Sequence, residues 1–246
     1  MVFSPRSLAS EVPEDRIYLF YTMYLLTLAG LLGMTITGDA FNLFVFLEIS
    51  SLSTYVMISL GNSKRALTSA FRYLILGTIG ATFYVIGVGL MYQMTGTLNM
   101  ADLSVRLPAV AETRTILVAI GFLTAGIGLK LGLFPIHGWL PNVYTFAPSV
   151  VTAFLAATAT KVAVYVLLRI YFTVLGVRAF ENLPIDEALL FLGVIAILSM
   201  SIVAIYQTNA KRLLAYSSVA QIGYIIIGIN LLTTTGIAAG ILHVFN

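Results

Sequence analysis

Near its middle the sequence runs Gly126-Ile-Gly-Leu-Lys-Leu-Gly-Leu-Phe-Pro-Ile-His-Gly-Trp-Leu-Pro141. The stretch is apolar enough for a membrane helix, yet it holds a lysine, a histidine and two prolines. Each proline lacks an amide hydrogen, so we expect the carbonyls of Leu131 and His137 to have no helical partner. Such a break persists at membrane depth only where protein or a water-filled cavity covers it. We therefore predict a helix over 115–146 that is interrupted at 135–141, inside a bundle.

The composition of the whole chain indicates a lipid-embedded protein. Its 246 residues are 59% hydrophobic and 9% charged, with a mean hydropathy of +0.99, whereas soluble domains carry about 25% charged residues. The absence of cysteine excludes disulfides, thiolate metal sites and cysteine-ligated iron–sulfur clusters. We therefore expect no cofactor in this chain, and any redox chemistry must belong to partner subunits. The net charge is only +3 and the basic residues are scattered, so a nucleic-acid partner is not expected.

Apolar stretches long enough to cross about 30 Å of hydrocarbon predict seven membrane helices, with an eighth that begins near residue 235. The seven lie near 16–37, 41–60, 67–95, 115–146, 149–174, 188–208 and 213–233. The predicted fold is therefore an all-α polytopic membrane protein.

The distribution of lysine and arginine between the loops predicts the orientation. If odd-numbered helices run outward, the inner side holds seven basic residues and the outer side four. The inner ones are Arg6, Arg16, Lys64, Arg65, Arg72, Lys211 and Arg212, and the outer ones are Arg106, Arg114, Arg169 and Arg178. The excess predicts a cytoplasmic N-terminus in a cell membrane.

Glu48 is a carboxylate in the middle of a predicted membrane helix. Ser51 and Tyr55 follow it by three and seven positions, so the three side chains share one polar face. A buried carboxyl near a cation can switch between charged and neutral forms. The alternative is a static ion pair, for which Arg72 on the next helix is the candidate partner.

Two lysines, Lys130 and Lys161, stand inside apolar segments. An ammonium in hydrocarbon costs at least about 2.5–3.5 kcal/mol, so such residues indicate charge movement. Lys130 lies beside the predicted break, where water can reach it, and the alternative is a side chain that extends to the interface. Lys161 is about twelve residues from either end of its helix, too far for that alternative at about 1.5 Å per residue. We predict that both lysines relay protons.

Three further polar residues stand out. His137, in the break, has an imidazole that ordinarily titrates near neutral pH and suits proton shuttling, but it could equally satisfy a freed carbonyl. His243, near the end of the chain, is a weaker relay candidate. Asp39 precedes a helix and is predicted to be its N-cap. We find no metal-ligand spacing and no phosphate-binding glycine loop.

Several motifs resemble the antiporter-like subunits shared by respiratory complex I, membrane-bound hydrogenases and Mrp cation/proton antiporters. They are Gly38-Asp-Ala-Phe-Asn-Leu-Phe-Val-Phe-Leu-Glu48, the stretch 130–141, Ala147-Pro-Ser, Thr160-Lys-Val-Ala-Val-Tyr165 and Ala210-Lys-Arg-Leu-Leu-Ala-Tyr-Ser-Ser218. They occur in order at fitting separations, from about residue 16 to the end. The opening Gly-Asp-Ala-Phe-Asn is most similar to the D-type member of the Mrp antiporters and its hydrogenase-type relatives.

The resemblance implies about fourteen helices that include two inverted five-helix repeats, each with a half-channel. It implies that Glu48 is the glutamate of the first repeat, Lys130 the lysine on its broken helix and Lys161 the bridging lysine. His243 matches a histidine at the start of the third helix of the second repeat. Asn142 departs from many relatives, which carry aspartate there, and this removes one titrating group.

The same resemblance divides the chain into four expected parts. These are an N-terminal cytoplasmic segment at 1–15, the first repeat at 16–174, an outer loop at 175–187 and a second repeat at 188–246. Relative to the family pattern, the first three helices have no counterpart, and the second repeat is cut before its broken helix. Expected partners are other membrane subunits, homologous antiporter-like subunits among them, together with lipid, protons and candidate sodium ions.

Three functions compete on this information. The leading hypothesis is an ion-translocating subunit of a redox-driven complex or of a cation/proton antiporter. The second is a structural subunit that retains the motifs but conducts nothing. The third, a membrane enzyme acting on quinone or lipid, is disfavoured because the sequence offers no nucleophile, metal or cofactor constellation, and no catalytic redox site.

Overall fold

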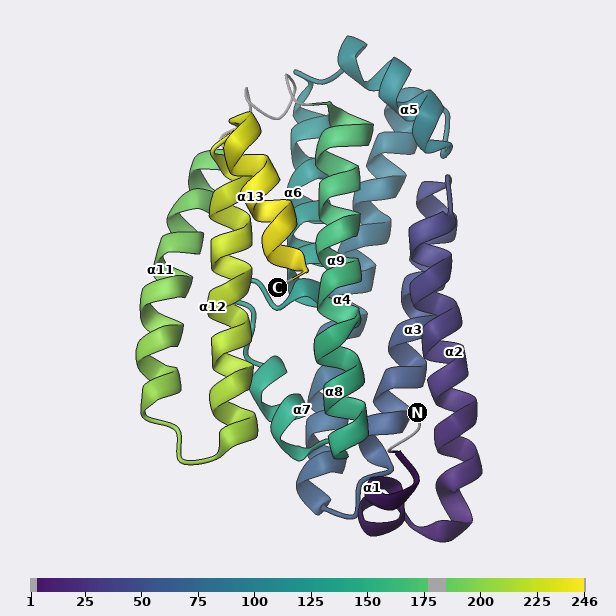
Figure 1. The fold of residues 1–246 in the computed structure, drawn as a ribbon. Coiled ribbons are helices and arrows are strands. Elements are labelled where there is room, and N and C mark those ends of the chain that lie inside the picture. The colour runs from purple at the N-terminus through teal and green to yellow at the C-terminus, as the bar shows by residue number, and fades with distance from the viewer. Residues whose placement is uncertain (1–3, 177–184, 246) are drawn as a thin grey trace.

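The computed structural model describes residues 4–176 and 185–245. The elements in these ranges are helices, and one isolated antiparallel bridge joins Asp39 to Asn99. Figure 1 shows long helices that run roughly side by side, with short helices at both ends of the bundle.

Seven described segments are long and apolar enough to cross a membrane, so the predicted all-α polytopic fold is confirmed. In chain order the principal helices are α2 (Ile17–Ile36), α3 (Ala40–Ser59), α4 (Lys64–Thr95), α6 (Arg114–Leu131), α7 (Leu140–Phe146), α8 (Ser149–Ala157), α9 (Ala159–Leu168), the π-helix η3 (Arg169–Leu175), α11 (Ile185–Ile205), α12 (Ala210–Asn230) and α13 (Thr234–Val244). The chain is a multi-pass membrane protein.

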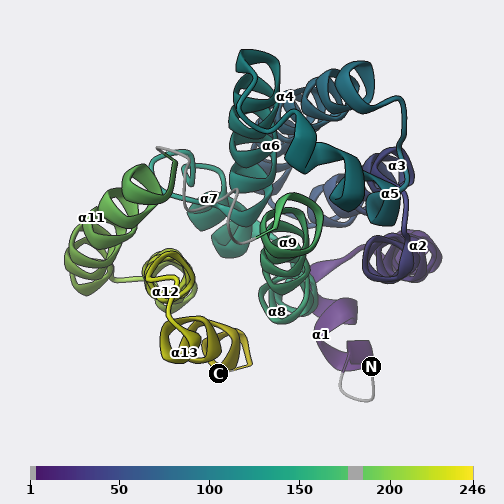
Figure 2. The ribbon, with the colours of Figure 1, turned by 90° about the horizontal axis from the view of Figure 1, so that it is seen from above.

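The helices form two groups when viewed from above (Figure 2). Helices α2 to α9 make the larger group, while α11, α12 and α13 form a second group that packs on α7 through α12. The first helix of the second group, α11, runs opposite to α2 (Figure 1), the direction that an inverted repeat requires. The division into repeats stays a prediction, and residues 177–184 of the expected outer loop lie outside the described residues.

Small residues let α4 and α6 approach closely. A Cβ placed on Gly126 would lie 2.6 Å from the carbonyl oxygen of Gly80, so α6 does not tolerate a larger residue at this position. Helices in lipid associate through this kind of close packing, because apolar side chains gain little by leaving lipid for protein.

The N-terminal segment is folded against the bundle. It contains α1 (Ser4–Glu11) and the short 3-10 helix η1 (Glu14–Arg16). Glu11 accepts hydrogen bonds of 2.6 Å from both the backbone amide and the hydroxyl of Ser149, the first residue of α8. A carboxylate is favoured at a helix N-terminus because it satisfies free amides and complements the helix dipole.

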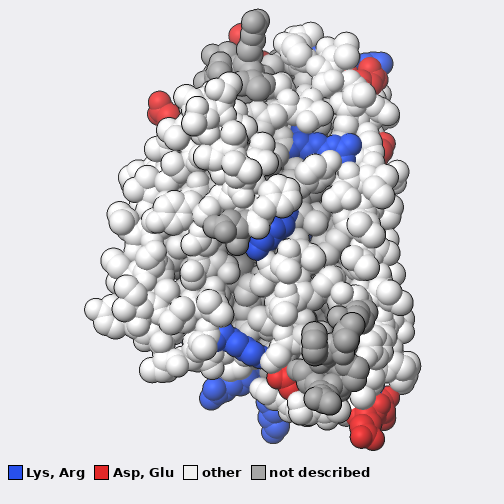
Figure 3. Space-filling view, viewed as in Figure 1, with Lys and Arg blue, Asp and Glu red and all other residues white. Residues whose placement is uncertain are grey.

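The surface agrees with a membrane setting. Figure 3 shows one face that is largely uncharged, with charged side chains concentrated toward the two ends and isolated basic side chains between them. Lys64 and Arg65 at the start of α4 lie at the same end as the described N-terminus, as do Lys211 and Arg212 at the start of α12 (Figure 1). The predicted orientation of this end toward the cytoplasm stays a prediction.

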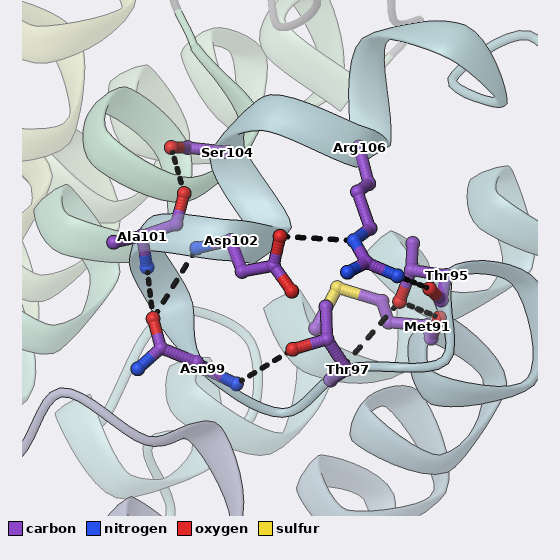
Figure 4. Close-up of polar contacts among 8 residues, drawn as sticks. All are labelled: Met91, Thr95, Thr97, Asn99, Ala101, Asp102, Ser104 and Arg106. Atoms are coloured by element: carbon purple, nitrogen blue, oxygen red, sulfur yellow. Dashed lines mark hydrogen bonds and ion pairs between the residues drawn. The ribbon is translucent and has the colours of Figure 1, made fainter.

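The corner between α4 and α5 (Met100–Arg106) is held by polar contacts (Figure 4). Asn99 caps α5 by accepting from the amides of Ala101 and Asp102, just as Asp39 caps α3, which confirms the predicted N-cap at Asp39. Arg106 donates to Asp102 at 2.9 Å and to the carbonyl of Thr95 at 3.1 Å. The guanidinium therefore links the end of α4 to α5.

This contact predicts a pH-dependent stability. The hydrogen bond from Arg106, followed by one from Thr97, holds the pKa of Asp102 below its ordinary value. A lowered pKa in the folded protein stabilises it above the ordinary carboxyl pKa, and the stabilisation is lost as the pH falls through the folded value. We expect Asp102→Asn to lower the melting temperature in detergent at pH 7, with a difference from wild type that shrinks below about pH 4. Glu112→Gln, which changes a carboxylate in the following loop, is the control, and a difference that is constant with pH would contradict this role.

Candidate functional site

The break in the fourth predicted helix begins earlier than the prolines indicate. Helix α6 ends at Leu131, and Gly132 has a φ of +79°. The amide of Leu133 donates to the carbonyl of Gly128 at 2.8 Å, which is the Schellman pattern of a helix C-terminus. The prediction that Pro135 interrupts the helix is therefore wrong in its cause, because the left-handed glycine ends the helix three residues before it.

The backbone groups released at the break find partners within the chain. The carbonyl of Leu129 accepts from the indole of Trp139 at 2.8 Å, and the carbonyl of His137 accepts from the amide of Leu140 at 3.0 Å. The carbonyl of His137 thus lacks the helical partner that Pro141 cannot supply, as expected, but a turn bond satisfies it. Trp139 and Leu140 are buried, but 135, 136 and 138 are exposed, so the segment lies inside the bundle only in its second half.

Lys130 is positioned one residue before this helix end and reaches the polar face of α3. Its ammonium donates to the hydroxyl of Ser51 and, at 3.3 Å, to that of Tyr55. It lies 5.5 Å from the ring centroid of Tyr55 and 5.4 Å from that of Tyr73, a cation–π arrangement. The side chain lines a cavity of about 40 Å³ together with Ser51, Tyr73 and apolar residues of α2, α3, α6 and α9. The predicted polar face of α3 therefore contacts Lys130.

The ammonium fits at this point because α4 has a glycine opposite. A Cβ on Gly77 would overlap the hydroxyl of Tyr55 and lie 3.5 Å from the Lys130 nitrogen. The absence of a side chain at Gly77 thus makes room for both groups.

Glu48 is the counter-charge of Lys130 without direct contact. One carboxylate oxygen is buried and has no hydrogen-bond partner among the described residues. The charges of Glu48 and Lys130 interact, but neither of the two ion pairs found within 4.0 Å in the described chain involves Glu48. Such a carboxylate is uncompensated locally, and this is costly unless water or a proton reaches it.

The candidate ion pair between Glu48 and Arg72 is not formed. Tyr55 of α3 lies opposite Gly77 of α4, and from this level Glu48 and Arg72 lie in opposite directions along the antiparallel helices. At about 1.5 Å per residue the backbones of the two residues are roughly 15–20 Å apart along the helix axis. Arg72 instead lines a separate pocket of about 200 Å³ beside α7.

Lys161 lies at a second interruption, which the sequence prediction of one helix over 149–174 missed. Helix α8 ends at Ala157, Thr158 has non-helical angles (φ −123°, ψ −55°), and α9 begins at Ala159. The ammonium of Lys161 donates to the carbonyl of Ala156 at 2.7 Å, on the far side of the break. The last turn of the same segment is the π-helix η3.

The structure brings Lys161 and His243 to one cavity. This cavity, about 280 Å³, lies between α9 and the second helix group, and its polar lining consists of Thr160, Lys161, Ser218, Gln221 and His243. The Nε2 atom of His243 contacts the amide oxygen of Gln221. The sequence prediction missed Gln221, which only the packing of α12 on α13 places beside the histidine.

His137 is separate from both lysine cavities. Its ring stacks on Phe134, with centroids 5.4 Å apart, and its Nδ1 atom is buried without a hydrogen-bond partner among the described residues. The imidazole is absent from the linings of the Lys130 and Lys161 cavities. Neither of its predicted roles is tested by these contacts.

The two cavities lie on different faces of α9. Ala159 and Ala163 line the Lys130 cavity, whereas Thr160 and Val164 line the Lys161 cavity. The site therefore consists of two cations, the partly buried Lys130 and the exposed Lys161, one on each side of a single helix and each next to a break in its own helix.

Comparison with known proteins assigns the chain to a sequence family. Residues 37–246 match the family model described as "NADH:quinone oxidoreductase/Mrp antiporter, TM". The chain is 48% identical over its full length to NADH-quinone oxidoreductase subunit N of Desulforudis audaxviator, of which it covers 48%. It is 33% identical over 99% of its length to the D-type member of the Na(+)/H(+) antiporter of Alkalihalophilus pseudofirmus, of which it again covers 48%.

The fold is similar to that of a chain in a solved Mrp complex. A chain of the Mrp complex from Dietzia superposes on 91% of this chain with a TM-score of 0.83 and 29% identity, and 41% of that chain is covered. The present chain thus spans about half the length of the relatives that it matches.

The helix end at Gly132 gives a stability prediction. Alanine at Gly132 would adopt a left-handed backbone and place its Cβ 2.8 Å from Leu140, so we expect a loss of about 1–2 kcal/mol in the free energy of unfolding. Gly138 has open space around its Cα, and Gly138→Ala is the matched control in the same turn. Detergent-based unfolding measures both, and equal stabilities would show that Gly132 does not need its positive φ.

A second pair of glycines tests the packing around the Lys130 ammonium. In a helix, Gly→Ala ordinarily stabilises by about 0.5–1 kcal/mol, and we expect this sign for Gly89→Ala, which has open space on α4. Gly77→Ala should have the opposite sign, because its Cβ displaces the Tyr55 hydroxyl from Lys130. The comparison uses thermal unfolding of the two variants, and the same sign for both would contradict the described position of Tyr55.

Proposed function

We infer an ion-translocating function from one premise, that this chain belongs to the NADH:quinone oxidoreductase/Mrp antiporter transmembrane family. We propose that it forms part of an antiporter-like subunit of a multisubunit membrane complex and carries protons through charged residues of its membrane helices. Sodium is the second candidate ion, since relatives include proteins named as Na(+)/H(+) antiporter subunits.

One observation carries the proposal: two lysine ammonium groups stand on membrane-spanning helices, Lys130 partly buried and Lys161 exposed in the described chain, and each lines a cavity next to an interrupted helix. An ammonium at membrane depth is unfavourable, and a purely structural position would be filled better by an apolar residue. Broken helices at membrane depth also indicate ion sites in transporters, because they present polar backbone to a cavity.

The arrangement suggests a role for each charge. Glu48 favours the protonated form of Lys130, because an opposite charge stabilises an ammonium. Neutralising Glu48 would therefore release a proton from Lys130. Lys161 and His243 share a larger cavity toward the second helix group, where an ammonium and an imidazole can pass a proton on.

The setting follows from the family and the charge distribution. We propose that the chain lies in the cell membrane beside other membrane subunits, homologous antiporter-like ones among them. The basic end of the bundle would face the cytoplasm. Ion translocation would be driven either by redox chemistry in a partner subunit or by an opposing cation gradient. Which of the two applies is a property of the whole assembly.

A second candidate function is a structural subunit that conducts nothing. The small size of the Lys130 cavity, about 40 Å³, and the helix between the two cavities favour it. Ion flux separates this candidate from the first.

Substitutions of Lys161 distinguish ion translocation from a purely structural role. Lys161→Met keeps the length of the side chain but cannot bind a proton, so we expect coupled ion flux to fall about a hundredfold or more, with normal assembly. Lys161→His should retain part of the flux, because imidazole also titrates. The measurement is proton flux in proteoliposomes that contain the whole complex, with subunit stoichiometry determined in parallel. Lys64→Met, at the basic end of α4, is the control. Wild-type flux in the Lys161→Met complex would exclude Lys161 from the path and favour the structural role.

A further inference from the structure

Arg72 of α4 is a cation that the proposed ion path does not use. Its guanidinium takes part in neither of the two ion pairs, and in none of the cation–π contacts, that the described residues make. The residue is exposed and lines the pocket of about 200 Å³ beside α7. The other described residues of that lining are neutral, Ser69, Trp139 and Asn142 among them. The pocket therefore carries one uncompensated positive charge.

The polar groups of this pocket suit an anion. The hydroxyl of Ser69 donates to the carbonyl of Arg65 at 2.8 Å, so its proton is already in use. The guanidinium of Arg72 and the side-chain amide of Asn142 line the same pocket and both carry N–H donors. A guanidinium binds phosphate or carboxylate oxygens in pairs, and the neutral amide adds a donor without cancelling the charge.

An apolar groove of about 500 Å³ continues from the pocket along α4, which runs at the edge of the larger helix group (Figure 2). Ile75 lines both the pocket and the groove, and the groove extends past Ile79 to Phe83. Thr78 and Thr82 also line it, but their hydroxyls donate to carbonyls of their own helix at 2.8 Å. The groove therefore offers an occupant methyl, methylene and ring surfaces, which suit a hydrocarbon chain.

The pocket and the groove lie at the depths that a phospholipid requires. Helix α4 has 32 residues and a length of about 48 Å, whereas the hydrocarbon is about 30 Å thick. With the surplus shared by its two ends, the hydrocarbon begins roughly six residues after Lys64. Arg72 is thus within about one turn of this boundary, and a long basic side chain reaches the headgroups from there. From Arg72 to Phe83 the helix rises about 16 Å, close to the ~15 Å of one leaflet.

We propose that α4 and α7 form a binding site for one anionic phospholipid. The headgroup phosphate binds the Arg72 guanidinium and the Asn142 amide, and one acyl chain lies in the groove from Ile75 to Phe83. The separation of the cation from the apolar groove along the membrane normal matches the separation of charge from hydrocarbon in a lipid. The inference goes beyond the proposed function, because it does not depend on ion movement through the lysines.

Photolabelling of the whole complex tests the site. The complex is reconstituted in phosphatidylcholine vesicles with a phosphatidylglycerol that carries a diazirine on one acyl chain, and mass spectrometry locates the label. We expect label on residues 74–83. Unlabelled phosphatidylglycerol should compete for this label about fivefold better than unlabelled phosphatidylcholine, the preference that one basic residue near the surface gives an anionic lipid.

Substitutions assign the preference to the pocket. Arg72→Gln should abolish the fivefold preference, whereas Arg72→Lys should keep part of it, because an ammonium also binds phosphate. Asn142→Asp places a carboxylate beside the guanidinium and should abolish the preference with almost no change in side-chain size. Lys64→Gln is the matched control: it removes a cation from the same end of α4 but outside the pocket, and the preference should remain.

Three results would overturn the proposal. Equal competition by the two lipids in the wild-type complex would mean that the groove contacts bulk lipid without selecting a headgroup. A wild-type preference in Arg72→Gln would exclude the guanidinium. No label on 74–83 would mean that a partner subunit covers this face of α4. If Arg72→Gln fails to assemble, Asn142→Asp decides, and an unchanged preference in that variant would show that the pocket does not bind the headgroup.

Discussion

The placement of the Lys130 ammonium constrains the rest of the structure around it. A cation inside a membrane protein needs hydrogen-bond acceptors, polarisable surfaces and an opposite charge, because lipid supplies none of them. Here the hydroxyls of α3, two tyrosine rings and the more distant Glu48 supply them. Three helices must therefore keep their register to within a fraction of a turn. The glycines that allow α4 to approach α3 and α6 serve this requirement as much as they serve packing.

The helix interruptions follow a shared physical logic. At Gly132 the chain reverses into a left-handed residue, and the released carbonyl of Leu129 is taken by an indole. At Thr158 the helix breaks without glycine or proline, and the ammonium of Lys161 takes the carbonyl of Ala156. At Gly132 the break lies next to Lys130 and positions its ammonium. At Thr158 the ammonium of Lys161 is itself the partner of the freed carbonyl. Each break thus satisfies one freed carbonyl with a polar side chain of the chain itself.

Much of the fold could be predicted from the sequence, because the length of an apolar segment and the polar residues that bound it are local properties. Apart from the interrupted ones, the membrane helices lie within about three residues of their predicted bounds, and the polar face of α3 and the cap at Asp39 follow from helical spacing. The register and the contacts between helices could not be predicted from such local properties. The alternative of a Glu48–Arg72 ion pair is not formed, and the sequence could not exclude it because the register of α3 on α4 is not encoded in either helix alone. The meeting of Lys161 with His243 likewise depends on packing between distant segments. The break at Thr158 carries no turn-forming residue, so no local signal indicated it.

The bond between Glu11 and Ser149 orders events during synthesis. The two residues are 138 positions apart, so at about 5–20 residues per second the carboxylate waits roughly 7–28 s for its partner to leave the ribosome. In that interval the leading segment has no helix terminus to dock on, and the earlier helices must insert without it. The contact therefore closes late, after the broken helix has turned back on itself. Once made, it joins the segment that carries Glu11 to the segment that leads into Lys161.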